Sequence, residues 1–268
     1  MSDQSAFKQL SGDVDFLASA LGQVLKELEG QRVFELVERV RHLTKGVRAG
    51  DEDAGWELDQ LLASLDTETA EMLVRAFTVY FQLVNLAEEI HRVRVNRHRE
   101  VSATVSEPRS ESIAAAVKAL SDQGMSRDAA AAFIRHLDLQ LTVTAHPTEV
   151  KRYTVRLKLE RIGEALRHLH EVELTPRDGR VLREQIYAEI ATLWLTREVA
   201  PERPTVLDEV KSALYYFRRS LLDAVPRIMA DLEQALDDYF PAEGPARPPH
   251  LEPPRLSPKR MVMRSPSF

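Results

Sequence analysis

A stretch of helical periodicity from Thr67 to Glu100 constrains the fold more than any other feature of the sequence. It reads "TETAEMLVRAFTVYFQLVNLAEEIHRVRVNRHRE" and contains neither glycine nor proline. Its apolar positions recur at intervals of three and four residues, which predicts one long helix with a single stripe facing a core. The residues assigned to that stripe are Leu73, Phe77, Tyr80, Phe81, Val84 and Ile90.

Further helices are predicted on both sides of this one, because glycine is scarce and Ala, Leu, Glu and Arg are plentiful. Two capping boxes each predict the start of a helix. The first covers Thr175 to Asp178 and has Pro176 at the first helical position, and the second covers Thr205 to Asp208. Pro226 is expected to kink or divide the second of these helices. The other predicted helices cover about 14–29, 32–48, 113–120, 126–137 and 147–169.

Composition narrows the class of protein. At 268 residues with 44% hydrophobic content, the chain can bury a substantial core in one or two domains. The net charge of −6 is spread along the chain, which disfavours a general nucleic-acid or acidic-lipid surface. There is no cysteine, no signal-peptide pattern and no long apolar run, so we expect a cytoplasmic protein without disulfides or membrane contact.

Two segments depart from the helical pattern. "LDLQLTVTAH", ending at His146, alternates apolar and polar residues and is the best strand candidate, yet a lone strand needs neighbours to pair with. Residues 241–268 hold more than half of the 14 prolines and are expected to be disordered or extended. The predicted division is therefore a helical part, 1–240, and a Pro-rich tail, 241–268. The tail is either genuine or the product of a reading-frame slip.

His146 is the leading candidate for a functional residue. Pro147 keeps it out of helical geometry, so it lies between a strand end and a helix start, where ligands and catalytic groups collect. The helix start favours anions, and Lys151, Arg152 and Arg156 follow it. Position and charge leave two alternatives open: His146 has only a structural role, and the basic residues after it form an ordinary solvated helix face.

The run "LTVTAHPTEVKRYTVRLK" closely resembles the histidine signature of the phosphoenolpyruvate carboxylase family. Residues Thr144 to Glu149 match its T-A-H-P-T-[EQ] core, and Arg152 takes the position of an arginine that follows. Two flanking segments are similar to the family as well, and the likeness extends over about 14–240. The matching flank residues are Asn85, Ala87, Glu88, His91, Leu193, Trp194, Thr196, Glu198, Arg203, Pro204, Thr205, Asp208 and Glu209.

The resemblance implies a fold and a reaction. The chain would be the predominantly α, helical N-terminal portion of a β/α (TIM-like) barrel enzyme, with about one barrel strand ending at the TAHPTE motif. The enzyme would be a carboxy-lyase that converts phosphoenolpyruvate and bicarbonate to oxaloacetate and phosphate and feeds the tricarboxylic acid cycle. His146 would act at carboxyphosphate breakdown and carboxylation, and Arg152 would stabilise substrate charge.

The resemblance also implies a Mg²⁺ cofactor, whose ligands are not expected in this chain, and a homo-oligomer, commonly a tetramer, in the full-length family. Because the family's chains are several times longer, we expect this chain to be inactive alone. The alternative is a non-catalytic helical interaction protein derived from the same fold. Nucleic-acid binding through "HRVRVNRHR" is disfavoured, because cations suit a helix end and no aromatic residues are interleaved.

Several other residues receive structural interpretations. His91 and His98, seven apart, are read as a solvated face, and His168 and His170 as surface residues. Trp194 and the aromatic group 215–217 are read as core or helix-packing residues.

Overall fold

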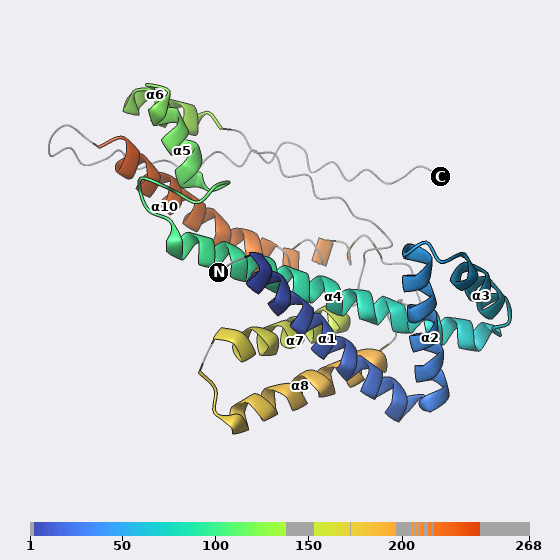
Figure 1. Ribbon diagram of the computed structural model, residues 1–268. Coiled ribbons are helices and arrows are strands. Elements are labelled where there is room, and N and C mark those ends of the chain that lie inside the picture. Colours follow the sequence, from blue (N-terminus) through green and yellow to red (C-terminus); the bar gives the residue numbers. More distant parts are fainter. Residues whose placement is uncertain are drawn as a thin grey trace. The chain divides into compact units, whose positions relative to one another are not determined.

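The structure is a computed structural model that describes residues 3–137, 153–171, 173–196 and 217–241, together with residues 205, 207, 210, 211, 214 and 215. Within these ranges it is built from helices, and no strand occurs there (Figure 1). The elements are α1 (Asp3–Leu28), α2 (Gln31–Arg48), α3 (Glu52–Ala63), α4 (Thr67–Ser102), α5 (Ile113–Asp122), α6 (Arg127–Arg135), α7 (Tyr153–Glu171), α8 (Pro176–Trp194), η2 (Phe217–Leu221) and α10 (Leu222–Tyr239).

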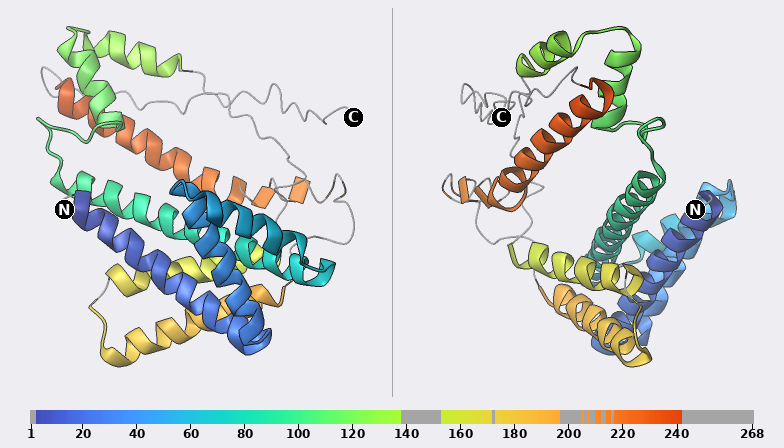
Figure 2. Two further views of the ribbon diagram at one scale, coloured as in Figure 1. Left: turned by 45° about the vertical axis from the view of Figure 1, so that its right-hand side comes forward. Right: turned by 90° about the vertical axis from the view of Figure 1, so that its left-hand side faces the viewer.

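The chain divides into two compact units. The first unit combines Met1–Val95 with Lys151–Val199, and the second combines Asn96–Val150 with Ala200–Phe268. Both units are therefore discontinuous in sequence, and the long helix α4 contributes to each of them. In the first unit α7 packs closely against α8, and α2 packs against α3 (Figure 2).

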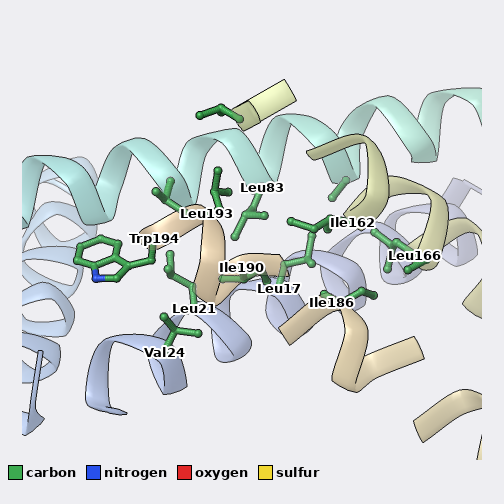
Figure 3. Close-up of a cluster of buried hydrophobic side chains, with 14 of the residues drawn as sticks. Leu17, Leu21, Val24, Leu83, Ile162, Leu166, Ile186, Ile190, Leu193 and Trp194 are labelled. Atoms are coloured by element: carbon green, nitrogen blue, oxygen red, sulfur yellow. The ribbon is translucent and has the colours of Figure 1, made fainter. Parts of the chain in front are cut away.

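The core of the first unit lies where α1, α4, α7 and α8 meet. Figure 3 shows Leu17, Leu21 and Val24 of α1 directed at side chains from the other three helices. The partners drawn there are Leu83, Ile162, Leu166, Ile186, Ile190, Leu193 and Trp194. The interpretation of Trp194 as a core residue is confirmed, since it is only 1% exposed. Burial of such large side chains is the main source of stability in a helical unit of this kind.

The long helix predicted from Thr67 is confirmed, but its buried face was partly misassigned. Leu73 and Ile90 are buried as expected, whereas Phe81 is 54% exposed and Phe77, Tyr80 and Val84 are only half-buried. At about 100° per residue, Phe81 lies nearly opposite Leu83, a fully buried residue of the helix. The buried arc is instead formed by Leu73, Ala76, Val79, Gln82, Leu83, Ala87 and Ile90.

Several helices begin at residues whose side chains cap the first turn. Thr175 Oγ1 accepts a hydrogen bond from the Asp178 amide at 3.2 Å, as an N-cap residue does, and donates one to the Asp178 carboxylate at 2.7 Å. Ser126 likewise accepts from the Ala129 amide at the start of α6. Helix α3 had no counterpart among the predicted helices, although Asp51 caps it by accepting from the Ala54 amide.

The second unit is built around α5, α6 and α10. Arg127 of α6 donates to the carbonyl oxygens of Leu236 and Phe240 and pairs with Asp237, so it satisfies the end of α10. α10 continues through Pro226, so the proline does not divide the helix. The π-turn η2 immediately precedes α10, and such turns relieve local disruption of the hydrogen-bond ladder.

The predominantly helical character predicted from the sequence is confirmed. The proposed strand lies almost wholly outside the described residues: Leu137 is described and is not in a strand, and 138–152 are not described. The tail is likewise outside them from residue 242 onwards. Among the helices that the structure describes, none is long and apolar enough to cross a bilayer.

Candidate functional site

The two predicted site residues, His146 and Arg152, lie outside the described residues. The structure does describe the helix that follows them, because α7 begins at Tyr153, one residue after Arg152. Val155, in the first turn of α7, is 1% exposed and belongs to the core of the first unit. The chain that leaves the TAHPTE segment therefore enters a helix that is fixed from its first turn.

A close approach between α7 and α4 adds to this anchoring. A Cβ atom placed on Gly163 would lie 3.1 Å from Leu86 Cδ1 and 3.6 Å from Ile90 Cδ1. The missing side chain thus lets the two helices come together at this point. Ile162 beside it is fully buried. Helix α7 is therefore packed against other helices of the first unit.

A buried carboxylate connects three helices of the first unit. Asp13 of α1 is 3% exposed and accepts a hydrogen bond from Arg94 Nη2 of α4 at 2.8 Å. Its other oxygen lies 2.6 Å from His170 Nε2 of α7. Burial raises the pKa of Asp13, but the hydrogen bonds and charges of His170 and Arg94 outweigh it, and the net pKa is lowered.

His170 is exposed, as expected for a surface residue, and this network gives it a partner that the sequence did not predict. His168 is an exposed surface residue, as expected, with its ring against the Glu164 carbonyl. His170, two residues further on, directs its ring at Asp13 from a position 157 residues away in sequence. Spacing on α7 alone gave no signal for that pairing. A buried acid beside a histidine and an arginine resembles a proton-transfer group, but each of its members is explained by the joining of α1, α4 and α7.

A second polar cluster holds the end of α8. Trp194 Nε1 donates to Glu29 Oε1 at 2.7 Å, and the Arg75 guanidinium lies 4.7 Å from the centre of the indole ring. Arg75 also donates to the carbonyl oxygens of Trp194 and Thr196. The cluster satisfies carbonyls that a helix end leaves unpaired and places a cation where the helix dipole favours one. It fixes the point from which the chain proceeds toward the predicted motif residues Glu198 and Arg203, which are not described.

The matched residues of α4 lie on different faces. Ala87 is fully buried, whereas Asn85 and Glu88 are exposed. The ring of His91 is half-buried, and its Nδ1 atom is enclosed without a hydrogen-bond partner within the described residues. The reading of His91 as part of a solvated face is therefore wrong for that atom. Across the described part of the chain, no three His, Asp or Glu side chains come together in a way that could hold a metal ion.

Comparison with known proteins gives the family. A model of phosphoenolpyruvate carboxylase matches residues 10–253. A phosphoenolpyruvate carboxylase from Thermus thermophilus is 47% identical over 237 residues, which cover 88% of this chain and 26% of that relative. One from Rhodothermus marinus is 38% identical over 244 residues, 90% of this chain and 26% of the relative.

The chain thus spans about a quarter of the length of the curated relatives that it matches. The TAHPTE segment, α7 with its anchoring residues, and the cluster at the end of α8 all fall within the matched region. The match covers most of the 268 residues. On this evidence the chain belongs to the phosphoenolpyruvate carboxylase family.

Proposed function

We propose that this chain forms the amino-terminal part of a cytoplasmic enzyme that carboxylates phosphoenolpyruvate with bicarbonate, yielding oxaloacetate and phosphate for the tricarboxylic acid cycle. The observation that carries the proposal is the unbroken T-A-H-P-T-E run at Thr144 to Glu149 inside a region that matches the family. Because about three quarters of the relatives' length lies beyond the match, activity is assigned to the longer assembly and not to this chain alone.

His146 is proposed to serve the carboxylation step. An imidazole can donate a proton to a developing oxyanion and take it back near neutral pH. In the proposed reaction it acts while carboxyphosphate breaks down to carbon dioxide and phosphate and the enolate captures the carbon dioxide. Arg152 is proposed to stabilise negative charge on the phosphate or the carboxylate, as a guanidinium does well.

The proposed Mg²⁺ would be a Lewis acid for the phosphoryl and enolate oxygens. The described residues offer no group of three His, Asp or Glu side chains that could hold such an ion. No step is therefore assigned to the metal here. Its ligands, like the oligomeric contacts of the family, are proposed to come from the remainder of a family-length chain.

The experiment uses a chimera in which residues 10–240 of this chain replace the matched part of the Thermus thermophilus relative. Oxaloacetate formation is measured with phosphoenolpyruvate, bicarbonate and Mg²⁺, alongside the isolated chain, for which no turnover is expected. In the chimera, His146→Asn is expected to lower kcat by about 100-fold or more, the usual contribution of an acid–base group. His168→Asn, at an exposed position of α7, is the matched control and should leave kcat unchanged.

A chimera with normal turnover after His146→Asn would contradict the assigned role. A well-folded chimera without any turnover would instead favour the non-catalytic interaction protein. That second candidate rests on the exposed apolar side chains of the structure, of which Phe81 is one.

A further inference from the structure

Arg75 of α4 holds the chain at the point where it leaves α8. Its Nη2 atom donates to the carbonyl oxygens of Trp194 and Thr196, the second at 3.3 Å. The guanidinium also lies over the indole ring of Trp194, which is buried at one end of the core (Figure 3). A guanidinium suits this double contact, because it is planar and offers several donors in a fixed arrangement.

The chain stays ordered for two residues beyond the end of α8 at Trp194. The Thr196 amide donates to the Leu193 carbonyl at 3.0 Å, and Thr196 Oγ1 donates to the Thr192 carbonyl at 2.6 Å. Arg75 then donates to the Thr196 carbonyl. These contacts set the direction in which the chain leaves the helix, at the last residue that the structure describes there.

The start of α7 lies at the same end of the α7–α8 pair. The two helices follow each other closely in sequence and pack along their lengths (Figure 1). Glu189 of α8 pairs with Lys158 of α7 at 4.0 Å and with Arg161 at 3.2 Å. Glu189 lies five residues before the end of α8, and Lys158 lies five residues after the start of α7. The end of α8 and the start of α7 are therefore level with each other.

Two segments with residues of the family motifs thus join the described helices at neighbouring points. The segment that carries His146 and Arg152 enters α7 at its first residue. The segment that carries Glu198 and Arg203 leaves from the end of α8, where Arg75 holds the backbone. A misplacement of about 1 Å at such a point can lower a rate by about 100-fold, because catalysis depends on how the reacting groups are aligned.

We propose that Arg75 is a positioning residue of the carboxylation site. It acts through the backbone at Trp194 and Thr196, and it keeps the chain that leaves α8 aligned with the chain that enters α7. The inference rests on the proposed function, because it assigns Arg75 to the same reaction as His146. If Arg75 served only to satisfy the end of α8, its replacement would lower stability and leave the turnover of the folded enzyme unchanged.

Kinetics of the chimera described above separate these two roles. Arg75→Lys keeps the positive charge but loses the planar group that reaches both carbonyl oxygens. We expect it to lower kcat per folded enzyme by about tenfold and to change KM for phosphoenolpyruvate by less than about twofold, because the reactants still bind while their alignment is impaired. Arg92→Lys, at an exposed position of α4, is the matched control and should change neither constant.

A second variant measures the effect of lost stability alone. Glu29→Ala removes the hydrogen-bond partner of Trp194 Nε1 but leaves both carbonyl contacts of Arg75 in place. It should lower the midpoint of thermal unfolding, as Arg75→Lys should, without lowering kcat at a temperature at which both variants are folded. An unchanged kcat with Arg75→Lys would overturn the proposal, and so would an equal loss of kcat with Glu29→Ala.

Hydrogen exchange of the chimera supplies a measurement that needs no turnover. Arg75→Lys should make amides at the end of α8 exchange at least about tenfold faster, since the last turn then opens more readily, and should leave those of α2 unchanged. Unchanged exchange at the end of α8 would overturn the inference whatever the turnover. An inactive chimera with this faster exchange would count against the proposed function alone. A chimera that loses turnover with His146→Asn but not with Arg75→Lys would count against this inference alone.

Discussion

Asp13 shows how much a single residue can organise in this chain. Its side chain is almost inaccessible to water, yet it is charged, because Arg94 and His170 supply a hydrogen bond to each oxygen. Such groupings stabilise only when every member is satisfied, and loss of one member leaves the others partly buried without a partner. The sequence offered no hint of it, since Asp13 sits in an ordinary run of α1 and its two partners come from distant helices.

Asp13→Asn is expected to lower the free energy of unfolding by about 1–3 kcal/mol at neutral pH, because Arg94 then loses its charged partner. Asp15→Asn, at an exposed position on the same helix, should change it by less than about 0.5 kcal/mol. Urea denaturation of the three proteins provides the comparison. Equal stability of Asp13→Asn and the unaltered chain would contradict the assigned role of the network.

The difference in the free energy of unfolding between the unaltered chain and Asp13→Asn should also depend on pH. The pKa of Asp13 is lowered in the folded chain, so its contribution is fully present above the unfolded value of about 3.9 and is lost as pH falls through the lower folded pKa. The difference between the unaltered chain and Asp13→Asn should therefore shrink as the pH falls below about 4.

At the scale of elements, the close contact of α2 with α3 depends on a missing side chain. A Cβ atom on Gly46 would lie 2.8 Å from Ala54 Cβ and 3.6 Å from Asp51 Oδ2. Asp51 caps α3, so a displacement here disturbs both the packing and the start of that helix. Gly12 of α1, in contrast, has open space around the same position.

Gly46→Ala is expected to destabilise the chain by about 1–2 kcal/mol, because the clash outweighs the helix propensity that alanine gains. Gly12→Ala should stabilise it by about 0.5–1 kcal/mol through that propensity alone. Thermal unfolding followed by circular dichroism distinguishes the two outcomes. If both substitutions stabilised the chain, the close approach of α2 and α3 would be refuted.

Elements also show where reading the sequence succeeded. The starts of the helices capped by Thr175 and Ser126 were predicted well, because these residues act through neighbours within three residues. The first helix was predicted from about residue 14, but α1 begins at Asp3. Which face of a helix is buried was predicted less well. Phe81 is apolar and correctly spaced for a stripe, but its exposure depends on where α1, α7 and α8 lie, which spacing within α4 does not encode.

The candidate site likewise has parts that local sequence predicts and parts that depend on tertiary packing. His146 and Arg152 were found from local sequence and from resemblance, and their roles remain predictions, since both lie outside the described residues. The anchoring of α7, the Asp13 network and the Arg75 cluster were not foreseen. Each joins residues far apart in the chain: Arg75 reaches Trp194 across 119 positions. Long-range pairing of this kind arises from tertiary packing, and local pattern cannot supply it.

On the scale of the whole molecule, the two units differ in the size of their cores. Among the described residues, the first unit buries large side chains from four helices, whereas the buried cluster of the second contains Val117, Ile134, Leu236 and Phe240 with three alanines. Because less apolar surface is removed from water, the second unit is expected to open more easily.

Native-state hydrogen exchange should therefore show amides of α5 exchanging before those in the second half of α8. Leu17→Ala, which removes a buried side chain of the first unit, should accelerate exchange in α8 and leave the rate in α5 unchanged. Exchange of both regions at one common rate, altered together by Leu17→Ala, would show that the units open as one and would contradict the division.

The interruption of the first unit by residues 96–150 has a consequence for synthesis. Helices α1 to α4 leave the ribosome first but cannot bury their inner faces until α7 and α8 have followed them. The chain from residue 96 to the end of α8 at Trp194 is roughly 100 residues long, and at about 5–20 residues per second its translation takes about 5–20 s. During that interval chaperones can bind the exposed apolar faces of the nascent amino-terminal helices. Faster translation of the intervening codons would shorten the time for which these faces are exposed.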